Sequence, residues 1–175
     1  MNPMQQVKLE KVTLNIGIGS AGEKLENAKT LLERISGAKA VYTQAKRRNP
    51  TFKIKKGENI GAKVTLRGSR AVEVLKKMLE TIDYSLKEES FDRYGNVSFG
   101  IKEYIDISGM KYDPKIGMMG FDVCVSLAKP GKRVTCRRIA KKRISGRQKV
   151  SAAEAQAFMK EKFGVKIVSA KEVAE

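Results

Sequence analysis

The chain has 175 residues and a formal net charge of +17, from 36 Lys and Arg against 19 Asp and Glu. Its two cysteines and its lack of histidine exclude a disulfide framework, a common zinc site and the Ser-His or Cys-His pairs of hydrolases. The N-terminal residues lack the apolar core of a signal peptide, and no apolar run is long enough to span a bilayer. We therefore expect a cytoplasmic protein that is not an enzyme and needs no metal or other cofactor.

Periodic apolar residues in the first half of the chain predict three strands and two helices. Alternation with polar residues predicts strands at 11–16 and 60–67, with another strand at 40–45. Apolar residues at helical spacing predict a helix over 25–35, which ends at Gly37. A second helix is expected to begin at Ser69, because serine is a favoured N-cap.

The second half of the chain contains further strands and one more helix. The pattern predicts a turn at 93–96, a strand at 97–101, a loop at 113–120 and another strand at 121–127. Ser151 and Glu154 have the spacing of a capping box and predict a helix that contains Ala155, Phe158 and Met159.

These elements together predict an α+β fold with two layers, a mostly antiparallel sheet and helices on one face of it. Residues 1–128 are expected to form the sheet domain. Residues 129–175 would add a basic segment and a C-terminal helix that packs on the same domain. The strands at 40–45 and 60–67 would form a hairpin whose long loop is basic.

The excess positive charge is concentrated in two segments. Residues 45–61 contain six cations and one acid, and residues 129–149 contain ten cations and no acid. These segments account for +15 of the net charge of +17, so the rest of the chain is nearly balanced. Clustered cations favour a polyanionic partner, and the lack of a broad apolar face favours nucleic acid over a membrane surface.

The predicted sheet has a polar face that suits RNA. Short hydrogen-bonding side chains and cations alternate with the apolar residues of the strands, and such groups can reach phosphates, ribose hydroxyls and base edges. A solvated face is the alternative interpretation of the same pattern. The residues concerned are Thr13, Asn15, Gln44, Lys63, Thr65 and Arg67.

A glycine motif near the N-terminus, Gly17, Gly19 and Gly22, matches G-x-G-x-x-G. A dinucleotide site would need an acidic residue about 20 positions later, but that region reads VYTQAKRR. A phosphate-binding P-loop would need Gly-Lys-Ser or Gly-Lys-Thr, whereas Glu23 follows Gly22. We interpret the three glycines as a bend between a strand and a helix.

Four segments in order, LNIGIG, TQAKRRNPTFKIKKGENIGAKVTLRG, FDRYGNVSFGIKEY and IGMMGFDV, resemble the ribosomal protein L5 family. The tail RRIAKKRISGRQKVSAAEAQAFMKEKFGVKI is similar to the archaeal and eukaryotic branch of that family. The resemblance covers nearly the whole chain. It implies a two-layer α+β protein in the central protuberance of the large ribosomal subunit, where it anchors 5S rRNA beside the L18 protein.

The resemblance also implies roles for particular residues. The polar sheet face would bind 5S rRNA through Lys11, Thr13, Asn15, Gln44, Lys63, Thr65 and Arg67. The hairpin loop is similar to the loop that contacts P-site tRNA, and its cations are Lys46, Arg47, Arg48, Lys53, Lys55 and Lys56. The segment DPKIGMMG would face the small-subunit head and its S13 protein. For residues 129–149 we hypothesise contact with 23S-type rRNA through Arg133, Arg137, Arg138, Lys141, Lys142 and Arg143.

Two other functions remain open on the sequence alone. One is a nucleotide-using enzyme built on the glycine motif, and the other is a basic nucleic-acid chaperone without a fixed partner. Binding of NAD or ATP would favour the enzyme. Equal binding of 5S rRNA and unrelated duplex RNA, with equal salt dependence, would favour the chaperone.

Overall fold

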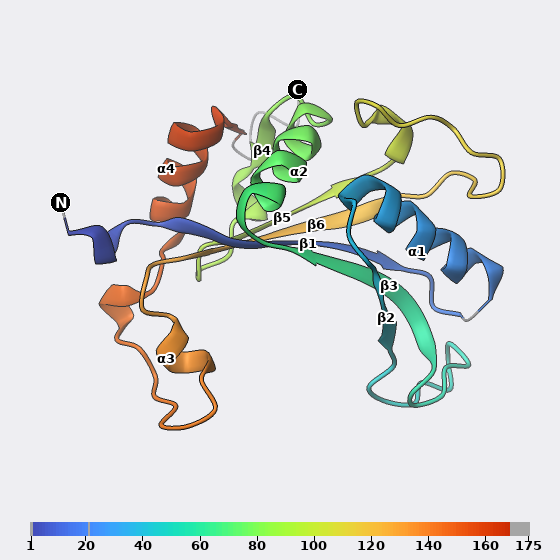
Figure 1. Cartoon of the computed structure of the whole chain (residues 1–175), viewed down its shortest axis with the longest axis horizontal. Coiled ribbons are helices and arrows are strands. Elements are labelled where there is room, and N and C mark those ends of the chain that lie inside the picture. The colour runs from blue at the N-terminus through green and yellow to red at the C-terminus, as the bar shows by residue number, and fades with distance from the viewer. Residues whose placement is uncertain (1, 21, 169–175) are drawn as a thin grey trace.

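The computed structural model describes residues 2–20 and 22–168 (Figure 1). Its strands are β1 (Lys8–Gly17), β2 (Val41–Gln44), β3 (Asn59–Leu66), β4 (Ser85–Lys87), β5 (Asn96–Ile101), β6 (Phe121–Ala128) and β7 (Lys166–Val168). Its α-helices are α1 (Glu23–Ser36), α2 (Gly68–Glu80), α3 (Arg133–Cys136) and α4 (Ala152–Phe163). Single turns of 3-10 helix occur at Pro3–Gln5, Glu88–Ser90, Tyr104–Asp106 and Gly146–Gln148.

The main sheet has five strands in the order β2-β3-β1-β6-β5, and every neighbouring pair is antiparallel. The central strand β1 pairs along most of its length with both β3 and β6. A register shift between Leu9 and Lys11 interrupts its pairing with β6. The predicted α+β fold is confirmed, and so is the hairpin formed by β2 and β3.

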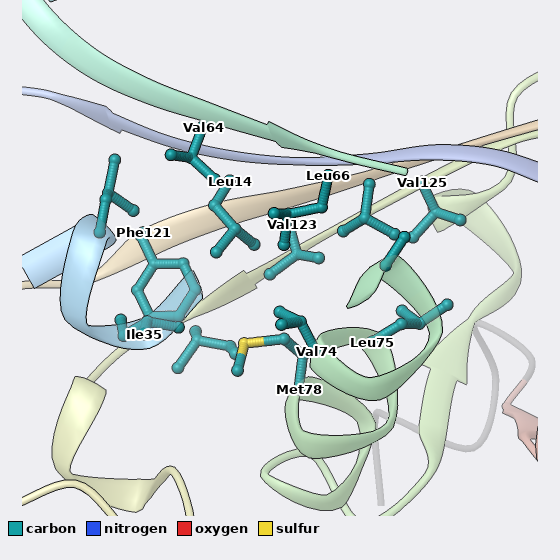
Figure 2. Packing of buried hydrophobic residues seen from close by; sticks show 14 of the residues in the cluster. Leu14, Ile35, Val64, Leu66, Val74, Leu75, Met78, Phe121, Val123 and Val125 are labelled. Atoms are coloured by element: carbon teal, nitrogen blue, oxygen red, sulfur yellow. The ribbon is translucent and has the colours of Figure 1, made fainter. Parts of the chain in front are cut away.

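Helices α1 and α2 cover one face of this sheet (Figure 1). The apolar residues that alternate along β1, β3 and β6 are buried on that side. Figure 2 shows Val74, Leu75 and Met78 of α2 packed toward Leu14 and Val123 of the sheet. Burial of side chains of this size contributes roughly 1.5–3 kcal/mol each, so this interface provides much of the stability of the fold.

The helix ends were predicted with mixed success. Helix α1 ends at Gly37, which adopts the left-handed conformation with φ of 62°. Helix α4 begins with the expected capping box, because the Ser151 side chain accepts from the Glu154 N–H and the Glu154 side chain accepts from the Ser151 N–H. The predicted Ser69 cap is wrong: α2 begins at Gly68, and the N-cap residue Arg67 makes no capping hydrogen bond through its side chain.

The C-terminal part of the chain packs on the same core as the sheet. Val150, Ala155, Met159 and Val165 belong to the cluster of buried apolar residues that includes the sheet. The short strand β7 pairs in parallel with β4 to form a separate two-stranded sheet, which the sequence analysis did not predict. Three-residue strands are too short to show a periodic pattern.

Among the described residues, no helix is both long and apolar enough to cross a membrane.

Candidate nucleic-acid interface

The face of the main sheet opposite α1 and α2 carries polar side chains. Within the described part of the chain, no long helix packs across it (Figure 1). We call this surface the open face. In antiparallel sheets, residues directly opposite one another point to the same side, so the register identifies its members. Thr13 lies between Thr65 of β3 and Cys124 of β6. Asn15 lies between Lys63 and Asp122.

The structure therefore places four predicted residues, Thr13, Asn15, Lys63 and Thr65, next to one another. Lys63 and Thr65 are exposed, whereas Thr13 and Asn15 are half-buried. Lys11 lies on the same face, where it pairs with Ser126. These side chains come from strands separated by about fifty positions in the sequence, and only the pairing of β1 with β3 brings them together.

Two predicted residues are set apart from this group: Arg67 lies at the edge of the open face, whereas the register does not place Gln44 on it, because its neighbour Thr43 shares the face of Gly61. Gln44 is exposed and pairs with Asn59 after a register shift that follows Thr43. Arg67 follows the last residue of β3, and its side chain is 62% exposed. Its Nη1 donates a long hydrogen bond of 3.5 Å to the Glu10 carbonyl oxygen and lies 4.0 Å from Glu10 Oε1. Such contacts leave most of the guanidinium available to another partner.

Strand β6 contributes residues that the sequence analysis did not identify as part of this face. Asp122, Cys124 and Ser126 pair with Asn15, Thr13 and Lys11. Burial, and secondly the nearby Asp122 carboxylate, raises the pKa of the Cys124 thiol. The polar residues that alternate along β6 in the sequence indicate a polar face, but the prediction used only the apolar residues of this strand.

The loop between β2 and β3, residues 45–58, forms a structured projection that we call the basic finger. Its base is closed by the Ala45 N–H donating to the Glu58 carbonyl and by the Gly57 N–H donating to the Ala45 carbonyl. Nearer the tip, Asn49 and Ile54 form an isolated antiparallel bridge. The loop has a defined backbone because these hydrogen bonds join its two sides.

The cations of the basic finger are available for a partner. All six predicted residues are exposed, and within the described part of the chain none forms an ion pair with an acid (Lys46, Arg47, Arg48, Lys53, Lys55 and Lys56). The one acid of the finger, Glu58, instead accepts a hydrogen bond from the Lys55 backbone N–H at 2.9 Å. Phe52 lies at the tip and is 71% exposed.

Residues 129–149 form a second cationic projection, which we call the basic arm. It leaves β6, contains α3 and returns to α4 (Figure 1). Five of its six predicted RNA-binding cations are exposed and make no ion pair with any described residue: Arg133, Arg138, Lys141, Lys142 and Arg143. The sixth, Arg137, is also exposed, and its Nε donates to the Ala140 carbonyl at 2.9 Å.

Two other lysines of the basic arm point inward and attach it to the domain. The buried Lys129 Nζ lies 2.8 Å from Glu154 Oε1 and 3.3 Å from the Lys149 carbonyl oxygen. Its hydrogen bond is the main reason why the pKa of Glu154 is lowered. Lys132 forms an ion pair with Glu10 of β1. Charge in the basic arm is thus divided between structural lysines and exposed cations.

The basic finger and the basic arm project from the sheet on the same side, away from α1 and α2 (Figure 1). The finger lies beyond β2 and β3, whereas the arm leaves the sheet near the start of β1. The open face therefore lies between two groups of exposed cations. A polyanion along this face would contact polar side chains in the middle and Lys or Arg on both sides.

The glycine motif makes a structural bend. Gly19 has φ of 83°, and the N–H groups of Ile18 and Gly19 both donate to the Ile60 carbonyl oxygen at 2.9 Å. These donors are used within the fold, so they do not form a cradle for phosphate groups. The geometry supports the structural interpretation over the nucleotide-binding one.

The predicted loop at 113–120 lies beside α1 rather than on the open face. Arg34 Nη1 contacts Asp113 Oδ2 at 2.7 Å, and Asn27 Nδ2 donates to the Lys115 carbonyl at 2.7 Å. The hydrogen bond from Arg34 is the main reason why the pKa of Asp113 is lowered. Met118 is 54% exposed on this loop. A partner at this loop would approach the helical side of the molecule.

Comparison with known proteins matches both parts of the chain to one family. Residues 2–55 match the family model described as ribosomal protein L5, and residues 59–166 match the model that describes the C-terminus of the same ribosomal family. Three archaeal proteins named large ribosomal subunit protein uL5 are similar over nearly their full length. The relative from Sulfurisphaera tokodaii is 51% identical, with 96% of each chain covered. The relative from Pyrobaculum aerophilum is 47% identical, with 95% of this chain and 93% of its own covered.

The third relative, from Methanobrevibacter smithii, is 45% identical, with 97% of this chain and 99% of its own covered. Proteins of this family are rRNA-binding structural components of the large ribosomal subunit in the cytoplasm, not enzymes. The match extends over the open face, the basic finger and the basic arm. The chain therefore belongs to the ribosomal protein L5 (uL5) family.

Proposed function

We propose that this structural constituent of the large ribosomal subunit binds 5S rRNA across its open face. The observation that carries the proposal is the position of the polar open face between two groups of exposed cations on one side of the sheet. The cations supply affinity by releasing counterions from phosphates. The short polar side chains supply selectivity, because Thr13, Asn15 and Thr65 can form hydrogen bonds with particular ribose hydroxyls and base edges.

The two projections would contact different RNAs. The basic arm begins beside the open face and continues away from it, which suits contact with the adjoining 23S-type rRNA. The basic finger is joined to the sheet by hydrogen bonds at its base and carries exposed cations toward its tip, which suits contact with P-site tRNA. Both contacts are with phosphates, so they would be strongly salt-dependent.

Protein partners would approach other surfaces. The loop at 113–120, held beside α1 by Arg34 and Asn27, would face the small-subunit head and its S13 protein. Its exposed Met118 gives this contact an apolar component. A neighbouring L18 protein would bind the same 5S rRNA beside this chain.

The test removes polar groups from the open face without changing its charge. We expect the double variant Asn15→Ala, Thr65→Ala to lose affinity for 5S rRNA by at least about tenfold, as two lost hydrogen bonds of about 1 kcal/mol each imply. Its affinity for unrelated duplex RNA should stay the same, because every cation remains. Filter binding at a fixed salt concentration measures both affinities.

The matched control is Thr30→Ala on α1, where the hydroxyl donates to the Glu26 carbonyl on the opposite side of the sheet. It should bind both RNAs as the unmodified chain does. If the double variant keeps its full affinity for 5S rRNA, the open face is not the selective surface. If the unmodified chain binds both RNAs equally, with equal salt dependence, the general chaperone function is correct instead.

A further inference from the structure

A cavity of about 240 Å³ lies between the basic arm and the adjacent ends of β5 and β6. Leu127, Ala128 and Val150 give it apolar surface, and the Tyr94 ring lines it as well. Three lysines of the basic arm, Lys129, Lys132 and Lys149, also line it, and no described acidic residue does. Lys129 and Lys132 are paired with Glu154 and Glu10, so Lys149 is the lining lysine that makes no ion pair with a described acid. The cavity thus combines apolar and aromatic surface with positive charge.

Tyr94 is held in place by two cations. Arg93 Cζ lies 4.8 Å from the centre of the ring, and Lys149 Nζ lies 5.7 Å from it. Both distances are within the range of a cation–π interaction, which favours one position of the ring. Tyr94 nevertheless remains 48% exposed. An exposed aromatic ring flanked by cations can stack on a base.

The turn that carries Tyr94 is packed closely against the segment that follows the basic arm. Gly95 has φ of 73°, and a Cβ atom there would lie 2.5 Å from Val150 Cγ1. Gln148 helps to fix the end of the arm, because its Nε2 donates to the carbonyl oxygens of Pro130 and Met4. The cavity wall is therefore built from two segments that hold each other in position.

We propose that this cavity binds one unpaired nucleotide of the rRNA, with the base against Tyr94 and the phosphate near Lys149. Its volume is below the roughly 300 Å³ at which sites for larger ligands begin, so a single base suits it better than a whole dinucleotide. A bare anion would leave the apolar surface unused, and a neutral apolar group would leave Lys149 unused. The proposal rests on the proposed function, because it requires RNA along the basic arm.

In the first measurement, AMP, GMP, CMP or UMP is added to the full chain, whose methyl groups are isotopically labelled. The NMR signals of the Leu127 and Val150 methyl groups are followed. We expect these signals to shift with at least one of the four nucleotides. Ribose 5-phosphate, which lacks a base, should leave them in place. The proposal is overturned if no nucleotide shifts them at millimolar concentration, or if ribose 5-phosphate shifts them equally.

The second measurement uses a single-stranded RNA decamer that contains 2-aminopurine, whose fluorescence is quenched by stacking. Tyr94→Leu keeps an apolar side chain but removes the ring, and it should weaken binding by about fivefold or more. Tyr94→Phe keeps the ring and should bind as the unmodified chain does. Equal affinities of the leucine and phenylalanine variants would overturn the stacking role.

The open-face variant separates this proposal from the proposed function. If the variant Asn15→Ala, Thr65→Ala loses affinity for 5S rRNA while Tyr94→Leu binds RNA as the unmodified chain does, only the proposal that the cavity binds a nucleotide is wrong. If the open-face variant keeps its 5S rRNA affinity, the proposed function is wrong whatever the cavity binds. Circular dichroism of each variant confirms that it is folded.

Discussion

At the scale of single residues, Gly61 shows how closely the strands beneath the open face approach one another. A Cβ atom at this position would lie 2.5 Å from the Ile16 carbonyl oxygen and 2.7 Å from Thr43 Oγ1. Gly61→Ala should therefore lower the free energy of unfolding by about 1–3 kcal/mol, because the backbone of β1 must move. Urea-induced unfolding at neutral pH measures the change.

Gly17 provides the matched control, because it is paired directly with Gly61 in the sheet. A Cβ atom there would meet no atom within 4 Å, and its φ is not in the left-handed region. Gly17→Ala should change the free energy of unfolding by no more than about 0.5 kcal/mol. Equal effects of the two substitutions would show that close packing at Gly61 is not the cause.

At the scale of elements, the ion pair of Lys129 with Glu154 joins the start of the basic arm to the first turn of α4. Glu154→Gln removes the charge opposite a buried ammonium and should cost about 1–2 kcal/mol at pH 7. The pKa of Glu154 is lower in the folded protein than in the unfolded chain. Its contribution is therefore fully present above the unfolded pKa of about 4.3 and is lost as the pH falls through the folded value.

The difference in stability between the unmodified chain and Glu154→Gln should consequently shrink between pH 5 and pH 2. Urea-induced unfolding across this range measures it. Glu161→Gln, at an exposed position of the same helix, is the control, because Glu161 has no ion pair among the described residues. A difference that stays constant down to pH 2 would contradict the assigned role of Glu154.

The elements with strong periodicity could be predicted from the sequence. Alternation identified β1, β3 and β6 because each has one buried and one polar face. The capping box identified the start of α4 because a local hydrogen-bond pattern defines it. Ser69 was wrongly predicted to be the N-cap of α2, because the helix begins one residue earlier, at Gly68, with φ of 66°. The preference of serine for N-cap positions does not indicate that conformation. The four-residue helix α3 gave no periodic signal.

At the scale of the whole molecule, charge placement could be predicted from the sequence, but its arrangement in space could not. The sequence located both cationic segments, yet only the fold shows that they project from the same side of the sheet (Figure 1). The inward roles of Lys129 and Lys132 depend on Glu154 and Glu10, which are distant in the sequence. Likewise, Asp122 and Cys124 reach Asn15 and Thr13 only through strand pairing.

The central claim is that 5S rRNA covers the open face, and Cys124 provides a native reporter in the middle of it. A Cys136→Ser variant leaves Cys124 as the only thiol. Its alkylation rate should be measured at one fixed pH, because the pKa of Cys124 is raised and the rate depends on the thiolate fraction. The three samples are the protein alone, the protein saturated with 5S rRNA and the protein saturated with unrelated duplex RNA.

We predict that 5S rRNA slows alkylation of Cys124 at least about tenfold, whereas the unrelated duplex, which adds negative charge without covering this face in a fixed position, slows it much less. An unchanged rate in the saturated 5S rRNA complex would contradict the account.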